Sequence, residues 1–255
     1  MSNDDSPSIP PVAVAARPWG FWATTGFALV IFAAFSVVGL VVGTPFRASI
    51  VADNPDIGQA ELAKLLQTNG LLVSLATLVG GFLTVALIAF FVRLRKGIAL
   101  REYLALARPD WRTIGVWLTA SACFLVASHG LKFVLGYDLV VDFQRQVYMT
   151  SRFPPLLLFA VIVIAPITEE CLFRGFLFAG WSQSKLGVVG TIVLTSLLFA
   201  LVHPQYDFFH VVLVFVFSIL VGIARHRTGS LVVPIIVHSI VNLTVAIETV
   251  IAVRS

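Results

Sequence analysis

The sequence predicts an all-α fold, a polytopic bundle of about seven or eight transmembrane helices around a polar cavity inside the bilayer. Hydrophobic residues make up 58% of the chain and charged residues only 12%, and the mean hydropathy is +0.97. Several apolar runs reach the roughly 20 residues that a helix needs to cross about 30 Å of hydrocarbon. These runs are continuous and do not alternate with polar residues, which excludes a membrane β-barrel.

The elements are expected in the following order. Residues 1–18 are rich in Ser, Pro, Ala and Asp without periodicity, which predicts a disordered tail. A single membrane domain follows, with N-terminal transmembrane helices in 19–152 and the helices that carry the unusual polar residues in 153–253. The expected spans are 20–43, 70–92, 113–136, 153–183, 187–203, 208–224 and 230–252.

The connections between the spans predict the topology. A short amphipathic piece over 57–68 ends at Asn69-Gly70, a plausible helix stop. The connection over 93–112 holds most of the basic residues, so the positive-inside rule places it and the N-terminus in the cytoplasm. This connection is either a short helix on the membrane surface or a solvated linker. Its basic residues are Arg93, Arg95, Lys96, Arg101, Arg108 and Arg112.

Charged and polar side chains interrupt the apolar runs of the C-terminal half. They are Glu169, Glu170, Arg174, His203, His238 and Asn242. Placing such groups in hydrocarbon costs several kcal/mol, so they normally face a protein-lined cavity and have a function there. This cluster is the candidate active site.

The spacing within the cluster suggests distinct roles. Glu170 and Arg174 lie four residues apart in acid-before-base order, which favours an ion pair on one helix. Glu169 lacks that partner, and an unpaired carboxylate in a site of low dielectric is suited to act as a general base. The alternative is that both acids merely neutralise basic residues in a core network.

Two further polar groups come from later helices. His238 and Asn242 share one helical face, from which an imidazole and an amide can donate hydrogen bonds to a developing oxyanion. His203 ends an apolar run and could share a water with Glu169. Pro166 is expected to kink its helix and to free backbone carbonyls toward the cavity. The remaining histidines, which are His129, His210 and His226, are weaker candidates.

In these positions the chain resembles a known family. The motifs Glu169-Glu170-x-x-x-Arg174, Phe199-x-x-x-His203 and His238-x-x-x-Asn242 are similar to those of the CAAX prenyl endopeptidase and bacteriocin-processing (CPBP) intramembrane proteases. The resemblance covers about residues 153–245. It implies that Glu169 and His203 activate a water, that His238 and Asn242 form an oxyanion hole, and that Glu170 and Arg174 support them.

The sequence constrains the cofactor and the partners less than it constrains the site residues. The site either needs no cofactor or binds zinc, in which case Glu169, His203 and His238 would be the ligands. The expected partners are the lipid bilayer and a peptide or protein substrate. The basic residues do not form a nucleic-acid-binding patch, and the sequence does not define an oligomeric state.

The resulting hypothesis is a multi-pass endopeptidase of a prokaryotic cell membrane that hydrolyses a membrane-associated peptide by direct attack of an activated water. Two alternatives remain. A transporter would use intramembrane Glu, His and Arg as an ion relay. A non-catalytic immunity or scaffold protein would keep the fold and tolerate loss of the glutamate.

Overall fold

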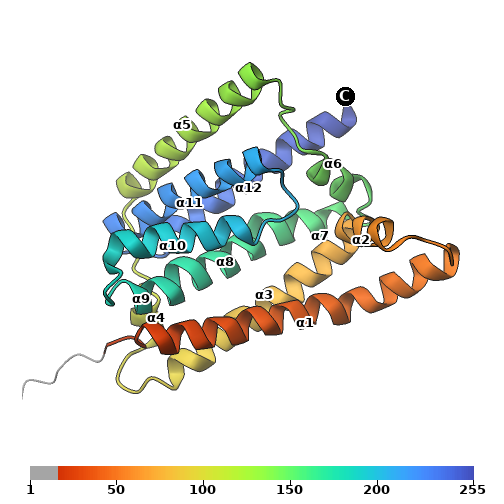
Figure 1. The fold of residues 1–255 in the computed structure, drawn as a ribbon. Coiled ribbons are helices and arrows are strands. Elements are labelled where there is room, and N and C mark those ends of the chain that lie inside the picture. The colour runs from red at the N-terminus through yellow and green to blue at the C-terminus, as the bar shows by residue number, and fades with distance from the viewer. Residues whose placement is uncertain (1–16) are drawn as a thin grey trace, which may run out of the picture.

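The computed structural model describes residues 17–255, and the predicted tail of residues 1–18 lies outside these except for its last two residues. The described part is helical and contains no strand (Figure 1). The helices are α1 (Phe21–Asp53), α2 (Gln59–Gln67), α3 (Gly70–Arg93), α4 (Leu100–Tyr103), α5 (Trp111–Leu135), α6 (Asp142–Met149), α7 (Pro154–Phe159), α8 (Ala165–Glu170), α9 (Phe178–Trp181), α10 (Gly187–Leu201), α11 (Phe208–Thr228) and α12 (Val232–Arg254).

The expected transmembrane bundle is confirmed. Six stretches are long and apolar enough to cross a membrane: α1, α3, α5, the continuous helix over Pro154–Trp181, α11 and α12. The predicted span at 187–203 corresponds to α10, which has only 15 residues. At 1.5 Å per residue α10 extends about 22 Å, less than the roughly 30 Å of the hydrocarbon core.

The first helix is longer than predicted. The expected span ended at residue 43, just before Pro45, whereas α1 continues through this proline to Asp53. A proline removes one backbone hydrogen bond, but transmembrane helices tolerate it where the freed carbonyl finds other partners. The residues on both sides of Pro45 remain mostly apolar, so the helix persists to the polar end at Asp53.

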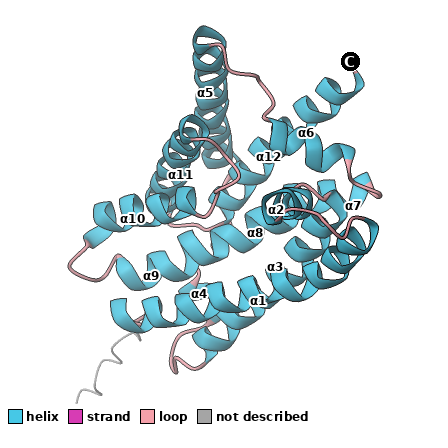
Figure 2. Ribbon diagram, turned by 45° about the vertical axis from the view of Figure 1, so that its right-hand side comes forward, coloured by secondary structure: helices cyan, strands magenta, loops and turns pink. Residues whose placement is uncertain are grey.

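The helix over Pro154–Trp181 lies in the centre of the bundle and joins α7, α8 and α9 (Figures 1 and 2). It contacts α3 on one side and α12 on the other, and α10 and α11 form an adjoining pair. The helix α5 stands at the edge of the bundle, where it contacts α11 and α12 (Figure 2). This arrangement gives the central helix a buried face and a face directed toward α12.

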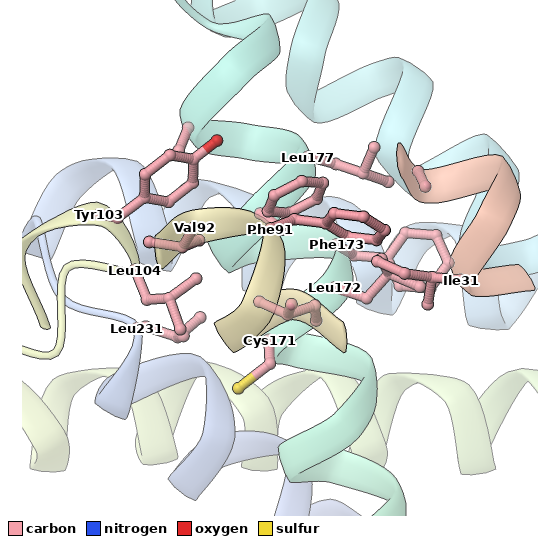
Figure 3. Close-up of a cluster of buried hydrophobic side chains, with 14 of the residues drawn as sticks. Ile31, Phe91, Val92, Tyr103, Leu104, Cys171, Leu172, Phe173, Leu177 and Leu231 are labelled. Carbon is pink, nitrogen blue, oxygen red and sulfur yellow. The ribbon is translucent and has the colours of Figure 1, made fainter. Parts of the chain in front are cut away.

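The largest hydrophobic core lies between the central helix, α1 and α3 (Figure 3). Four of its members are Phe173 and Leu177 of the central helix, Ile31 of α1 and Val92 of α3, all nearly inaccessible to solvent. In a membrane, close packing rather than hydrophobic expulsion holds helices together. This core therefore fixes one side of the central helix and leaves its opposite side free to carry polar groups.

A close helix contact at Gly180 gives a first testable prediction. A Cβ atom at this position would lie 2.7 Å from Cβ of the fully buried Thr24 of α1. We expect Gly180→Ala to lower the stability by about 1–3 kcal/mol, the usual cost of overpacking. Thermal unfolding of detergent-purified protein measures this effect. The matched control is Gly26→Ala in α1, where nothing lies within 4 Å; equal melting temperatures for the two variants would contradict the prediction.

Candidate active site

A cavity of about 380 Å³ lies against α8 and α12. Most of its wall is apolar, and its polar lining includes Glu169, His203, His238 and Asn242. The structure thus brings together in one cavity four residues that lie up to 73 positions apart in the sequence. Glu170 and Arg174 do not line the cavity but lie directly behind it, fully buried.

The two glutamates are carried by a short α-helical segment between two π-helical turns, Ala160–Ile164 and Cys171–Leu177. In the first turn the N–H of Ala165 donates to the carbonyl of Ala160, five residues earlier. The next residue, Pro166, has no N–H to continue this pattern to the carbonyl of Val161. The Asn242 amide nitrogen donates to that carbonyl at 2.8 Å, so α12 supplies the hydrogen bond that the proline omits.

The predicted ion pair between Glu170 and Arg174 is present. Arg174 Nη1 lies 3.2 Å from Glu170 Oε1, and the two side chains are 1% and 0% exposed. Arg174 Nη2 also donates to the carbonyl oxygen and the hydroxyl of Ser218, at 2.8 and 2.6 Å. The buried charges therefore have both an opposite charge and additional hydrogen bonds, which they need at this depth.

Glu170 also orients His238. Its Oε1 lies 2.8 Å from His238 Nδ1, and an ionised carboxylate only accepts hydrogen bonds, so Nδ1 carries the proton and donates. His238 Nε2 points the other way, 3.7 Å from Oε2 of Glu169. Because Nδ1–H is committed to Glu170, His238 can donate from Nε2 only in its doubly protonated form.

Glu169 differs from Glu170 in its surroundings. Its side chain is 29% exposed, compared with 0% for Glu170. Within residues 17–255 it forms no ion pair with Arg or Lys, and its nearest charged or chargeable partner is His238. Two adjacent glutamates thus face different surroundings: one is held in a buried ion pair, and the other presents a carboxylate to the cavity.

Phe199 explains the spacing of the second motif. Its carbonyl oxygen lies 2.7 Å from His203 Nδ1, which must donate, so neutral His203 keeps an unprotonated Nε2. The Phe199 ring packs against the rings of His203 and His238, with centroids 4.8 and 5.8 Å apart. The Arg174 guanidinium lies over the same ring at 4.9 Å. The sequence analysis assigned no role to Phe199, although one ring joins three residues of the site.

Comparison with known proteins finds similarity in the segment that carries the candidate site residues. Residues 151–244 match the family described as Type II CAAX prenyl endopeptidase, Rce1-like. A segment of 123 residues is 31% identical to the membrane-embedded CAAX protease MroQ of Staphylococcus aureus, covering 46% of this chain and 49% of that protein. Through this segment the chain is similar to the CAAX prenyl endopeptidase family. The six long apolar helices indicate a multi-pass membrane protein.

Two other relatives carry less functional information. The chain is 27% identical over 136 residues to an uncharacterized 24.3 kDa protein of Escherichia coli, covering 50% of this chain and 61% of that protein. It is 28% identical over 176 residues to the UPF0177 protein YbdI of Lactococcus lactis, covering 65% and 91%. The chain thus spans about half to three fifths of the length of the first two relatives. No solved structure matches the chain significantly.

The sequence analysis missed polar residues that this CAAX-protease-like chain places in the same cavity. Tyr206 lines it, and Gln144 of α6 donates to the Tyr206 hydroxyl at 3.4 Å. Burial raises the pKa of Tyr206, so its phenol stays protonated. Tyr206 also stacks on His203, with ring centroids 6.0 Å apart and planes within 6°. Only its position three residues after His203 could have indicated this placement.

A second polar group lines the cavity away from these residues. His129 of α5 lies 3.5 Å from Glu248 of α12, and Lys132 and His210 line the same wall. Two histidines that the sequence analysis set aside therefore lie in the cavity, while His226 does not line it. No local spacing indicates this arrangement, because it depends on how α5 lies against α12.

The residues suggested for zinc do not form a metal site in the structure. Within the described part of the chain, no three His, Cys, Asp or Glu residues lie close enough together to hold a metal ion. His238 Nδ1 is occupied by Glu170, and His203 Nδ1 by the Phe199 carbonyl. The donors left are His238 Nε2, His203 Nε2 and the Glu169 carboxylate, which are zinc-ligating atom types but are not grouped as a metal site in the described residues.

Proposed function

We propose that this protein is an endopeptidase that hydrolyses peptide bonds of a membrane-associated peptide or protein with a water activated by Glu169 and His203. The observation that carries the proposal is the contrast between Glu170, held by Arg174 and His238, and Glu169, which offers its carboxylate to the cavity. Both groups proposed to activate water, Glu169 and the unprotonated Nε2 of His203, are hydrogen-bond acceptors.

The proposed reaction uses the remaining groups in turn. Glu169 takes one proton from the water as the water oxygen attacks the scissile carbonyl carbon. His203 Nε2 accepts a hydrogen bond from the other hydrogen of the water. Doubly protonated His238 donates from Nε2 to the oxyanion, and the second N–H of the Asn242 amide does the same. When the C–N bond breaks, the proton on Glu169 passes to the leaving nitrogen. Glu170 and Arg174 position His238 throughout and do not touch the substrate.

The apolar lining and the membrane helices support a substrate that is itself membrane-associated. In the proposal the protein resides in a prokaryotic cell membrane with its N-terminus in the cytoplasm. The bacterial relatives and the basic connection before α5 support this placement.

A library of quenched-fluorescent peptides, incubated with detergent-purified protein with and without a strong zinc chelator, tests the proposal. We expect product to form at the same rate in both cases, because no three ligands lie close enough together to hold a metal ion in the described residues. Cleavage that stops on chelation would replace the direct mechanism with a zinc-dependent one. No product, together with solute uptake by proteoliposomes that depends on a proton gradient, would favour a transporter instead.

A further inference from the structure

A second pocket, of about 450 Å³, shares no lining residue with the cavity that holds the candidate catalytic residues. It forms where the start of α5 meets the end of α11. Its lining includes the guanidinium-bearing Arg108, Arg112 and Arg227, and it also contains the apolar side chains Val116 and Trp117. The proposed peptidase reaction uses none of these residues.

The three arginines are available to a ligand. All three side chains are exposed, and none is paired with a carboxylate within residues 17–255. Arg225, two residues before Arg227, provides a contrast, because it is buried and donates to the carbonyl of Arg174 at 3.0 Å. At the end of α11, Arg225 therefore points into the protein, whereas Arg227 lines the pocket.

One carboxylate also lines the pocket, but it is already engaged. Asp110 caps the start of α5 by accepting from the Thr113 N–H and hydroxyl, both at 2.8 Å. These hydrogen bonds lower the pKa of Asp110, so it remains ionised. Three guanidiniums against one carboxylate leave the pocket with a positive balance, which selects an anion.

The position of the pocket indicates the kind of anion. Arg112 belongs to the first turn of α5, and Val116 and Trp117 follow one turn further along this membrane-spanning helix. Val116 is 64% exposed, and Trp117 packs partly against the small core that α11 and α12 form. Arginines next to exposed apolar surface and a tryptophan are typical of the boundary between lipid headgroups and hydrocarbon.

We propose that this pocket binds an anionic membrane phospholipid. The headgroup phosphate lies between Arg112 and Arg227, whose planar guanidiniums match phosphate oxygens. One acyl chain follows Val116 and the exposed face of α5. This inference does not depend on the proposed peptidase activity, because no catalytic group takes part.

Native mass spectrometry of detergent-purified, delipidated protein, titrated with phosphatidylglycerol, tests the assignment. We expect wild type to retain one phosphatidylglycerol at concentrations where phosphatidylcholine does not bind. The variant Arg112→Gln/Arg227→Gln should bind it about tenfold more weakly or worse, because it loses two charge-assisted contacts. The matched control is Arg93→Gln/Lys96→Gln, which removes two exposed charges from α3 and the basic connection outside the pocket.

Each remaining outcome has a definite meaning. Equal lipid binding by the two double variants would overturn the proposal in favour of a diffuse basic surface, and unchanged binding by the pocket variant would overturn it outright. Displacement of phosphatidylglycerol by an equal concentration of inorganic phosphate would show that a free anion, not a lipid, occupies the pocket. Matching melting temperatures without lipid establish that the variants are folded.

Discussion

Replacement of Glu169 by Gln is expected to lower kcat/KM for peptide hydrolysis by about 10³-fold, within the range of general base catalysis. The amide keeps the shape of the side chain but cannot take the proton of the attacking water. Because Glu169 is partly exposed and forms no ion pair with Arg or Lys in the described residues, its loss should not unfold the protein. Steady-state hydrolysis and thermal unfolding of the same preparation measure the two effects.

Glu248→Gln is the matched control for this prediction. Glu248 lines the same cavity from α12, but its partner is His129 and it takes no part in the proposed reaction. We expect this variant to keep most of its activity. Full activity of Glu169→Gln would refute the assignment of the general base, and equal losses in both variants would indicate only that the cavity needs its negative charge.

Replacement of Arg174 by Met should have the largest effect on stability, about 3–5 kcal/mol, because it leaves a fully buried glutamate without an opposite charge. Activity should also fall, since Glu170 holds His238. Unfolding in detergent, followed by circular dichroism, gives the change in melting temperature.

The double variant Glu170→Gln/Arg174→Met separates charge from packing. Both partners are then neutral, so we expect it to be more stable than Arg174→Met alone, although it carries two substitutions instead of one. A double variant less stable than the single one would show that packing and hydrogen bonds to Ser218, not the buried charge, dominate the effect.

The bundle could be predicted because hydropathy over 20 residues is a local property, and six of the seven expected spans are long apolar helices. The ion pair between Glu170 and Arg174 was also predictable, since a helix brings residues four apart together. The persistence of α1 beyond Pro45 was not, because the proline is also compatible with a helix end. Whether such a helix continues depends on its surroundings.

The details of the site depend on longer-range structure. Pro166 correctly indicated a freed carbonyl, but no spacing rule identifies Asn242, 81 residues later than Val161, as its partner. Likewise, Tyr206 accepts a hydrogen bond from Gln144 only because α6 lies over the cavity. Sequence patterns reach one or two helical turns, whereas the cavity is built by helices that are distant in the chain.

The edge position of α5 bears on access to the cavity. Phe124, Leu125 and Ser128 of α5 form part of the cavity wall, yet no residue of this helix belongs to the main core around Phe173. Its apolar neighbours are those of the small cluster on α11 and α12. On this side a single helix at the edge of the bundle, packed against α11 and α12, therefore separates the cavity from the surroundings, while Glu169 and His238 are held by other helices.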